Sequence, residues 1–247
     1  MNASKWASVA AALIAALGSG CAQEQEALVA LHSPAFASDY SCLADPAATA
    51  LLQRGLLDVA YPTSYTLPVI LRNNLVSRSS STTNNQIEDG EMQLRDVDVT
   101  LTMEQAPEVI SRVAAQNGAN VEFTQPLPSQ SLAPASETGV LVDVITESAA
   151  RAFADAIEAV LDADARPIVV ADIVFHATRT GNSRGALGVI DARTYSFPIE
   201  LCLGCLGVDC SGCSDGVCPM GFSPTGVCGN TQDGSLFPAE CGPPSQQ

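Results

Sequence analysis

Five of the nine cysteines lie close together near the C-terminus, in the pattern Cys202-x2-Cys205-x4-Cys210-x2-Cys213-x4-Cys218-Pro219. Thiolates at such short spacing can hold zinc or an iron–sulfur cluster, or exchange a disulfide. Zinc ribbons separate their two C-x2-C pairs by about 15–20 residues, whereas four residues separate the pairs here. The spacing also departs from the C-x2-C-x2-C-x3-C-P run of bacterial ferredoxins. The pattern therefore favours structural disulfides, with metal binding and redox chemistry as alternatives.

The remaining cysteines are Cys21, Cys42, Cys228 and Cys241. Cys21 adjoins an N-terminal signal, and setting it aside leaves an even number of thiols, as a set of disulfides requires. The sequence does not select their pairing. Because Cys42 stands apart from the other cysteines, we expect it to pair with the C-terminal cluster. A bridge across so long a loop would stabilise by about 4–5 kcal/mol in the chain-entropy model. The Gly-, Pro- and Ser-rich tail needs such cross-links to hold a fold.

The first residues have the three parts of a secretory signal: Lys5, the apolar run 6–17, and the small residues 18–20. The apolar run is too short to cross a bilayer of about 30 Å as a helix. Cys21 after Gly18-Ser19-Gly20 resembles the lipobox of bacterial lipoproteins, although Gly18 stands where that family has an aliphatic residue. The resemblance implies lipidation of Cys21, and Ala22 after it implies the outer membrane. The alternative is cleavage after Ala22, which releases a soluble, secreted protein.

Net charge and composition exclude some classes of partner. The net charge is −16, and so negative a surface repels phosphate backbones, which argues against nucleic-acid binding. The only tryptophan, Trp6, lies in the signal, and this argues against a carbohydrate-binding module that stacks sugars on aromatic rings. The expected partners are the membrane, through the lipid on Cys21, and an unidentified envelope protein.

Few residues suggest catalysis. His32 falls in a predicted tether, and His176 is expected on the outward face of a strand beside Asp172, where such a pair is usually solvated. No nucleophile elbow, zincin helix or phosphate-binding loop is present. We therefore predict no catalytic residue, no metal site and no cofactor. The Asp-Gly dipeptides at 89–90, 215–216 and 233–234 are turn signals first, with calcium binding at loop tips as an alternative.

Five segments alternate apolar and polar side chains with a period of two, which predicts half-buried strands. They cover 65–72, 97–103, 140–144, 169–178 and 195–201, with a weaker strand at 120–124. The polar segments 77–85 and 180–185 are predicted loops. A helix is predicted over 147–162, where apolar residues recur every three or four positions after Thr146. Further helices are predicted at 107–117 and, from Asp45-Pro46, up to Gly55.

These intervals favour a mainly β fold: an antiparallel sandwich with one or two helices and an irregular, disulfide-stapled C-terminal tail. The segments 67–75 and 97–102 resemble the sandwich of late-embryogenesis-abundant modules, which implies an immunoglobulin-like strand arrangement. As a whole, the chain resembles exported lipoproteins of high-GC Gram-negative bacteria. The predicted organisation is a signal peptide (1–20), a lipid-anchored tether (21–39), a β-rich domain (40–201) and a cysteine-rich tail (202–247).

The predicted function is that of a non-enzymatic cell-envelope lipoprotein. Anchored by palmitate at Cys21 and facing the periplasm or the cell surface, it would present a disulfide-stabilised, acidic domain for a structural or protein-binding role. The alternative is an exported enzyme, or a redox or metal-binding factor, that uses the C-terminal cysteine cluster.

Overall fold

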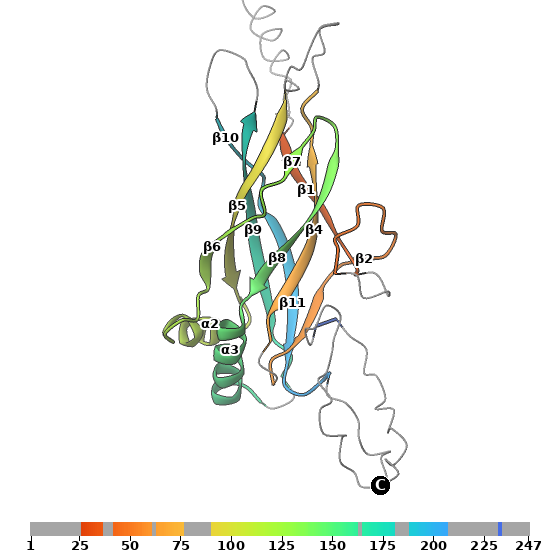
Figure 1. Ribbon diagram of the computed structural model, residues 1–247. Helices are drawn as coiled ribbons and strands as arrows, with labels where there is room; N and C mark the ends of the chain where they lie inside the picture. Colours follow the sequence, from red (N-terminus) through yellow and green to blue (C-terminus); the bar gives the residue numbers. More distant parts are fainter. Residues whose placement is uncertain are drawn as a thin grey trace, which may run out of the picture.

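The computed structural model describes residues 26–36, 42–60, 63–76, 90–162, 165–180, 188–206 and 232–233. Two β-sheets pack face to face, and two helices lie together at one end of them (Figure 1). Cys210, Cys213, Cys218, Cys228 and Cys241, together with Cys21 and the signal, lie outside the described residues. So do the predicted loop 77–85 and most of the loop 180–185.

The smaller sheet has the strand order β2-β1-β4-β8, with every pair antiparallel. Its strands are β1 (Leu28–Pro34), β2 (Leu51–Leu52), β4 (Tyr65–Asn73) and β8 (Glu137–Ile145). The pairing of β1 with β4 shifts register between Ala30 and His32. The longest pairing is that of β4 with β8, which runs from Tyr65 opposite Ile145 to Arg72 opposite Glu137.

The larger sheet has the strand order β3-β11-β9-β5-β6, with β10 beside β9 and β7 beside β5. Its strands are β3 (Gly55–Asp58), β5 (Glu91–Thr102), β6 (Glu122–Pro126), β7 (Ser131–Leu132), β9 (Ile168–Thr180), β10 (Val189–Asp191) and β11 (Tyr195–Cys202). Strands β3 and β11 pair in parallel. The prediction of an antiparallel sandwich holds for the other strand pairs among the described residues. It is wrong at this edge, because β3 follows directly from the smaller sheet and joins the larger one alongside β11.

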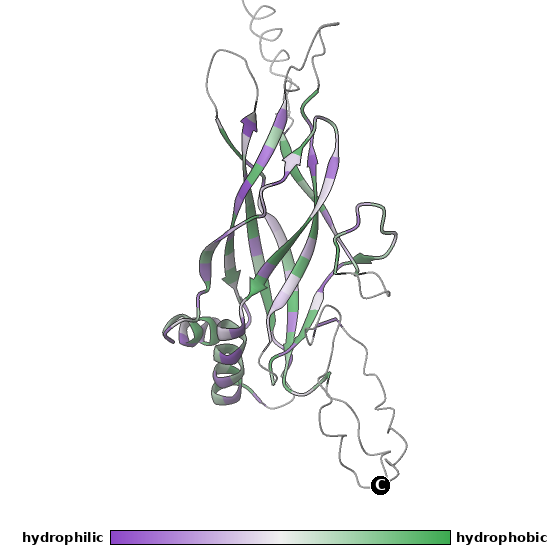
Figure 2. Ribbon diagram, in the orientation of Figure 1, coloured by the Kyte–Doolittle hydropathy of each residue, from purple (hydrophilic) through white to green (hydrophobic). Residues whose placement is uncertain are grey.

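Alternation along the strands sends apolar side chains of both sheets into one shared core. Figure 2 shows this alternation of hydrophobic and hydrophilic residues along the strands. Burial of one such Val, Leu, Ile or Phe side chain contributes about 1.5–3 kcal/mol. The central members of the core are Leu67, Val69, Leu71, Val97, Val99, Leu101, Val140, Val142, Val169, Ile173, Phe175, Phe197 and Ile199.

The two helices are α2 (Pro107–Ala114) and α3 (Glu147–Val160), and they contact each other. Proline opens α2, where a missing N–H is harmless. The hydroxyl of Thr146 caps α3 by accepting a hydrogen bond from the N–H of Ala149. Phe153 and Ile157 of α3 are fully buried against the core. Both helices were predicted, including the cap.

The five strongest strand predictions are confirmed as β4, β5, β8, β9 and β11, and the weaker one as β6. Two predictions are wrong. Residues 28–34, predicted as part of the tether, form β1, whose Leu28 is fully buried. The predicted helix between Asp45 and Gly55 is absent from these described residues, because the Asp45 carboxylate accepts from the N–H of Ala47 in a turn and Leu51–Leu52 pair with β1.

Candidate functional site

The C-x2-C pair at the end of β11 forms a turn built around a buried carboxylate. Cys202 and Cys205 form a disulfide, as the structural interpretation of the cysteine cluster predicted. Asp58, at the end of β3 and fully buried, accepts hydrogen bonds from the N–H groups of Gly204 (2.7 Å) and Leu206 (2.8 Å). It also accepts from the N–H of Ala60 at 3.1 Å. The carboxylate thus holds the disulfide turn onto the edge of the larger sheet.

Asp58, Cys202 and Cys205 are also the group of described residues whose potential ligand atoms all lie within 4.8 Å of one another. A metal ion would need the two sulfurs as thiolates. In the disulfide they are bonded to each other, and the carboxylate oxygens of Asp58 already accept three backbone N–H groups. In this oxidised state the three residues therefore form a structural staple.

Cys42 is disulfide-bonded as well. This agrees with its predicted role as a cross-linked residue, and its predicted pairing with the C-terminal cluster stays a prediction. The segment 42–46, which begins at this cysteine, lies against β8 at Gly139, and we call it the strap. A methyl group on Gly139 of β8 would lie 1.8 Å from the carbonyl oxygen of Ala44, so only glycine admits the strap so close to the sheet.

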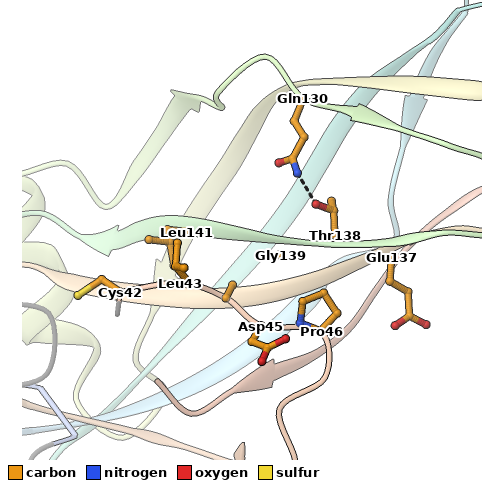
Figure 3. A pocket seen from close by; sticks show the side chains of 10 residues that line it. Cys42, Leu43, Asp45, Pro46, Gln130, Glu137, Thr138, Gly139 and Leu141 are labelled. Atoms are coloured by element: carbon orange, nitrogen blue, oxygen red, sulfur yellow. Dashed lines mark hydrogen bonds between the residues drawn. The ribbon is translucent and has the colours of Figure 1, made fainter. Parts of the chain in front are cut away.

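The strap forms one wall of a groove of about 520 Å³ (Figure 3). The opposite side carries Gln130, which hydrogen-bonds to the hydroxyl of Thr138. The groove is lined by apolar side chains, among them Leu43 and Leu141, and by the carboxylates of Asp45 and Glu137. Leu43 is 67% exposed, so the strap presents an apolar side chain beside the groove.

Two residues of the tail, Gln232 and Asp233, dock against the domain, and we call them the clasp. Gln232 is fully buried and forms an antiparallel bridge with Leu57 of β3. Its side chain accepts from the N–H of Thr66 and donates to the carbonyl of the same residue, both at 2.8 Å. The N–H of Asp233 donates to the carbonyl of Leu56 at 2.9 Å. The clasp therefore covers the free edge of β3 with a piece of the C-terminal tail.

The carboxylate of Asp233 completes the clasp from inside. It accepts from the hydroxyl of Tyr65 at 2.7 Å and from the N–H of Leu56 at 2.8 Å. Burial raises the pKa of Asp233 above its usual range, and these hydrogen bonds only partly counteract the rise. Burial and the neighbouring carboxylate also raise the pKa of Tyr65. Asp233 has a left-handed φ of 49°. Gly234, the second residue of its Asp-Gly dipeptide, lies outside the described residues, so the predicted turn stays a prediction.

His176 of β9 lies on the outer face of the larger sheet, as predicted, but its partners differ from the predicted one. Its Nε2 hydrogen-bonds to Asp98 of β5 at 3.0 Å and its Nδ1 to Asp191 of β10 at 2.8 Å. Asp172, the predicted neighbour, instead accepts from the hydroxyl of Ser196. Asp98 also accepts from Thr124 of β6 at 2.6 Å. One histidine thus joins three strands through two carboxylates.

Burial of the ring lowers the pKa of His176, but the hydrogen bonds and charges of Asp191 and Asp98 outweigh burial and raise it. The hydrogen bonds from Thr124 and His176 lower the pKa of Asp98. Both ring nitrogens of His176 are thus hydrogen-bonded to carboxylates in the structure. The three side chains therefore link β5, β9 and β10 across the outer face of the sheet.

His32 was predicted in the tether, and the structure places it in β1. Its Nε2 is the one buried side-chain nitrogen or oxygen without a hydrogen-bond partner in the described part of the chain. Local patterns did not indicate Asp58, Asp191 or the clasp, since each gains its partners through long-range pairing. The position of Asp98 on the outer face of the sheet was predictable, because it is one of the polar residues that alternate with valines in the predicted strand 97–103.

Comparison with protein-family models, curated proteins and solved structures finds no match. Within the described residues, no helix is both long and apolar enough to cross a membrane.

Proposed function

We propose that the protein is a non-enzymatic lipoprotein of the cell envelope, exported and anchored in the outer membrane through a lipid on Cys21. Its disulfide-stabilised, acidic sandwich serves a structural or protein-binding role. Its partners are the membrane, through that lipid, and an envelope protein.

The observation that carries the proposal is where the chain enters the sandwich. Leu28 pairs with Asn73 at one end of β4, whereas Tyr65 at the other end pairs with Ile145, just before α3. These two ends of β4 lie roughly 26 Å apart at about 3.3 Å per residue. A lipid on Cys21 would therefore hold the end with Leu28 near the membrane and direct the helices and the clasp away from it (Figure 1).

The length of the connection supports an exposed but closely held domain. Because β1 begins at Leu28, the chain from Cys21 to the sandwich spans at most roughly 25 Å. This is much shorter than the tether predicted over 21–39. A short connection limits where the domain can reach, which suits a structural role or contact with a partner beside the membrane.

An immunoglobulin-like assignment of the sandwich is part of the proposal. If the main strands are lettered in chain order, β1, β4 and β8 take the places of strands A, B and E in one sheet. Strands β6, β5, β9 and β11 then take the places of C′, C, F and G in the other sheet. The order of neighbours in each sheet supports the assignment, and β3 at the edge beside β11 is an addition to it.

Metabolic labelling with palmitate, followed by fractionation, tests the anchor. We expect label in the wild-type protein, which fractionates with the outer membrane, and none in Cys21→Ala, which becomes soluble in the periplasm or medium. An unlabelled wild-type protein whose membrane fraction is unchanged by Cys21→Ala would overturn the lipid anchor.

One observation favours a second candidate function, disulfide exchange: the Cys202–Cys205 pair ends a strand beside the buried carboxyl of Asp58. Mild reduction with dithiothreitol separates the two functions. A structural staple predicts slow loss of this disulfide, together with unfolding, and no free thiols in the native protein. An exchange function predicts rapid, selective reduction of Cys202–Cys205 in a protein that stays folded.

A further inference from the structure

Strand β8 ends the smaller sheet, so one of its long sides has no neighbouring strand among the described residues. The pairing with β4 determines which residues of β8 direct their backbone N–H and carbonyl groups toward β4 and which direct them away from it. The N–H of Asn73 donates to the carbonyl of Ser136 at 3.0 Å, and Leu71 lies opposite Thr138. Since bonding alternates along antiparallel strands, Thr138, Val140 and Val142 bond to β4.

Gly139, Leu141 and Asp143 consequently direct their backbone groups away from β4. A side chain confirms this direction, because the N–H of Asp143 donates to the amide oxygen of Gln125 at 3.1 Å. In the described part of the chain, neither Gly139 nor Leu141 makes a backbone hydrogen bond on this side. Two consecutive outward-facing residues thus offer their N–H and carbonyl groups as an open β-edge.

This open edge lies in the groove beneath the strap. Gly139 and Leu141 both line the groove, together with Leu43 and Pro46 of the strap (Figure 3). The close contact of Ala44 with Gly139 and the disulfide at Cys42 hold the strap beside the edge. The volume of about 520 Å³ lies in the range of ligand-binding clefts.

The charges around the edge favour a basic occupant. Carboxylates of Asp45 and Glu137 line the groove, although Glu137 also lies 3.8 Å from the guanidinium of Arg72. Asp143 lies further along the same edge, and the whole chain has a net charge of −16. A second copy paired antiparallel through this edge, with Gly139 opposite Leu141, would place Glu137 opposite Asp143. Like charges directly opposite each other destabilise strand pairing, so a second copy fits poorly.

We infer that the β8 edge binds an extended, basic segment of another protein by strand addition. The segment's backbone pairs with Gly139 and Leu141, its apolar side chains contact Leu43 and Leu141, and its lysine or arginine side chains meet Asp45 and Glu137. Main-chain bonds supply affinity in this mode and the flanking side chains supply specificity. The inference rests on the proposed protein-binding role and names its site and the chemistry of its partner.

A defined peptide tests the inference on the full chain with its disulfides intact. The probe is an eight-residue peptide of alternating lysine and valine with blocked ends, and its glutamate–valine counterpart is the control. We expect the lysine peptide to slow amide hydrogen exchange at Gly139 and Leu141 at least tenfold, measured by NMR. The glutamate peptide should bind at least tenfold more weakly.

Leu141→Pro removes the open N–H without removing a bond to β4, because edge strands tolerate proline where the N–H faces outward. We expect it to weaken binding of the lysine peptide at least tenfold. Leu141→Ala keeps the N–H and should retain more of the affinity. Should Leu141→Pro not fold, Glu137→Arg replaces it: a three- to tenfold loss is expected, while Glu158→Arg on the exposed face of α3 changes binding less than twofold.

The inference is overturned if the peptide protects amides elsewhere, if a folded Leu141→Pro binds like wild type, or if both peptides bind equally. It is also overturned if, without peptide, Gly139 and Leu141 become protected as protein concentration rises, since that result indicates pairing between copies. None of these outcomes changes the membrane fraction of the wild-type protein. The palmitate experiment therefore tests the anchor independently of the peptide experiment.

Discussion

The hydroxyl of Tyr65, fully buried where β4 begins, donates a hydrogen bond of 2.7 Å to the carboxylate of Asp233 in the C-terminal tail. The two residues are 168 positions apart. Around this bond, Gln232 pairs with Leu57 and Thr66, so the tail contributes to the edge of the larger sheet. Residues 232–233 and the sandwich should therefore unfold together.

Tyr65→Phe tests the contribution of this bond. The substitution keeps the ring in the core but deprives the partly buried Asp233 carboxylate of a donor. We expect a loss of about 1–3 kcal/mol in the free energy of unfolding at pH 7, the usual range for an unsatisfied buried polar group. Tyr195→Phe is the comparison variant, because it leaves the buried but uncharged hydroxyl of Ser33 without its partner at 3.1 Å, so a smaller loss is expected. Urea denaturation of both variants measures the difference, and equal losses would contradict the special role of Asp233.

Asp233→Asn tests the pH dependence of the clasp. Because burial raises the folded-state pKa of Asp233 above its unfolded value near 3.8, the folded state binds this proton more tightly than the unfolded chain. Stability should therefore decline as the pH rises from about 4 through the raised pKa. Asparagine still accepts from the N–H of Leu56 and carries no charge, so the decline should be smaller in the variant. Urea midpoints at several pH values between 4 and 7 check this, and parallel profiles would contradict it.

The fold was predictable from the sequence where patterns are local and unbroken. Valines 97 and 99 alternate strictly with polar residues, and the spacing of Phe153 and Ile157 after Thr146 marks a capped helix. Strand β1 escaped prediction because its register shifts between Ala30 and His32, which breaks the alternation that identifies strands. The helix predicted from Asp45-Pro46 is wrong because an Asp side chain can close a turn as well as cap a helix. Here the Asp45 carboxylate closes a turn by accepting from the N–H of Ala47.

The candidate sites were less predictable, for a different physical reason. Asp98 and His176 lie 78 positions apart, and only the pairing of β5 with β9 brings them together. Asp58 gains its partners Gly204 and Leu206 only when β3 joins β11. Each contact depends on which strands are neighbours, and a single sequence carries no local signal for that.

His176 also makes the free energy of unfolding depend on pH, but its effect begins near pH 6.5, whereas that of Asp233 begins near pH 4. Its raised folded-state pKa lies above the unfolded value near 6.5. The pairing with Asp98 and Asp191 therefore stabilises fully below about pH 6.5, and the contribution is lost as the pH rises through the raised pKa. NMR titration of the imidazole should give a pKa above 6.5 in the wild type and a lower one in Asp98→Asn and Asp191→Asn. Asp172→Asn, whose carboxylate bonds to Ser196 instead, should leave the pKa of His176 unchanged.

Asp58→Ala tests whether the carboxylate or the disulfide holds the turn after β11. The substitution leaves three backbone N–H groups, of Ala60, Gly204 and Leu206, without their acceptor. At about 1–3 kcal/mol for each unsatisfied group, the expected loss is about 3 kcal/mol or more. Replacing Cys202 and Cys205 together by serine opens only a short loop and should remove about 2 kcal/mol in the chain-entropy model. Urea denaturation ranks the two variants, and a larger loss from the double serine variant would show that the disulfide dominates.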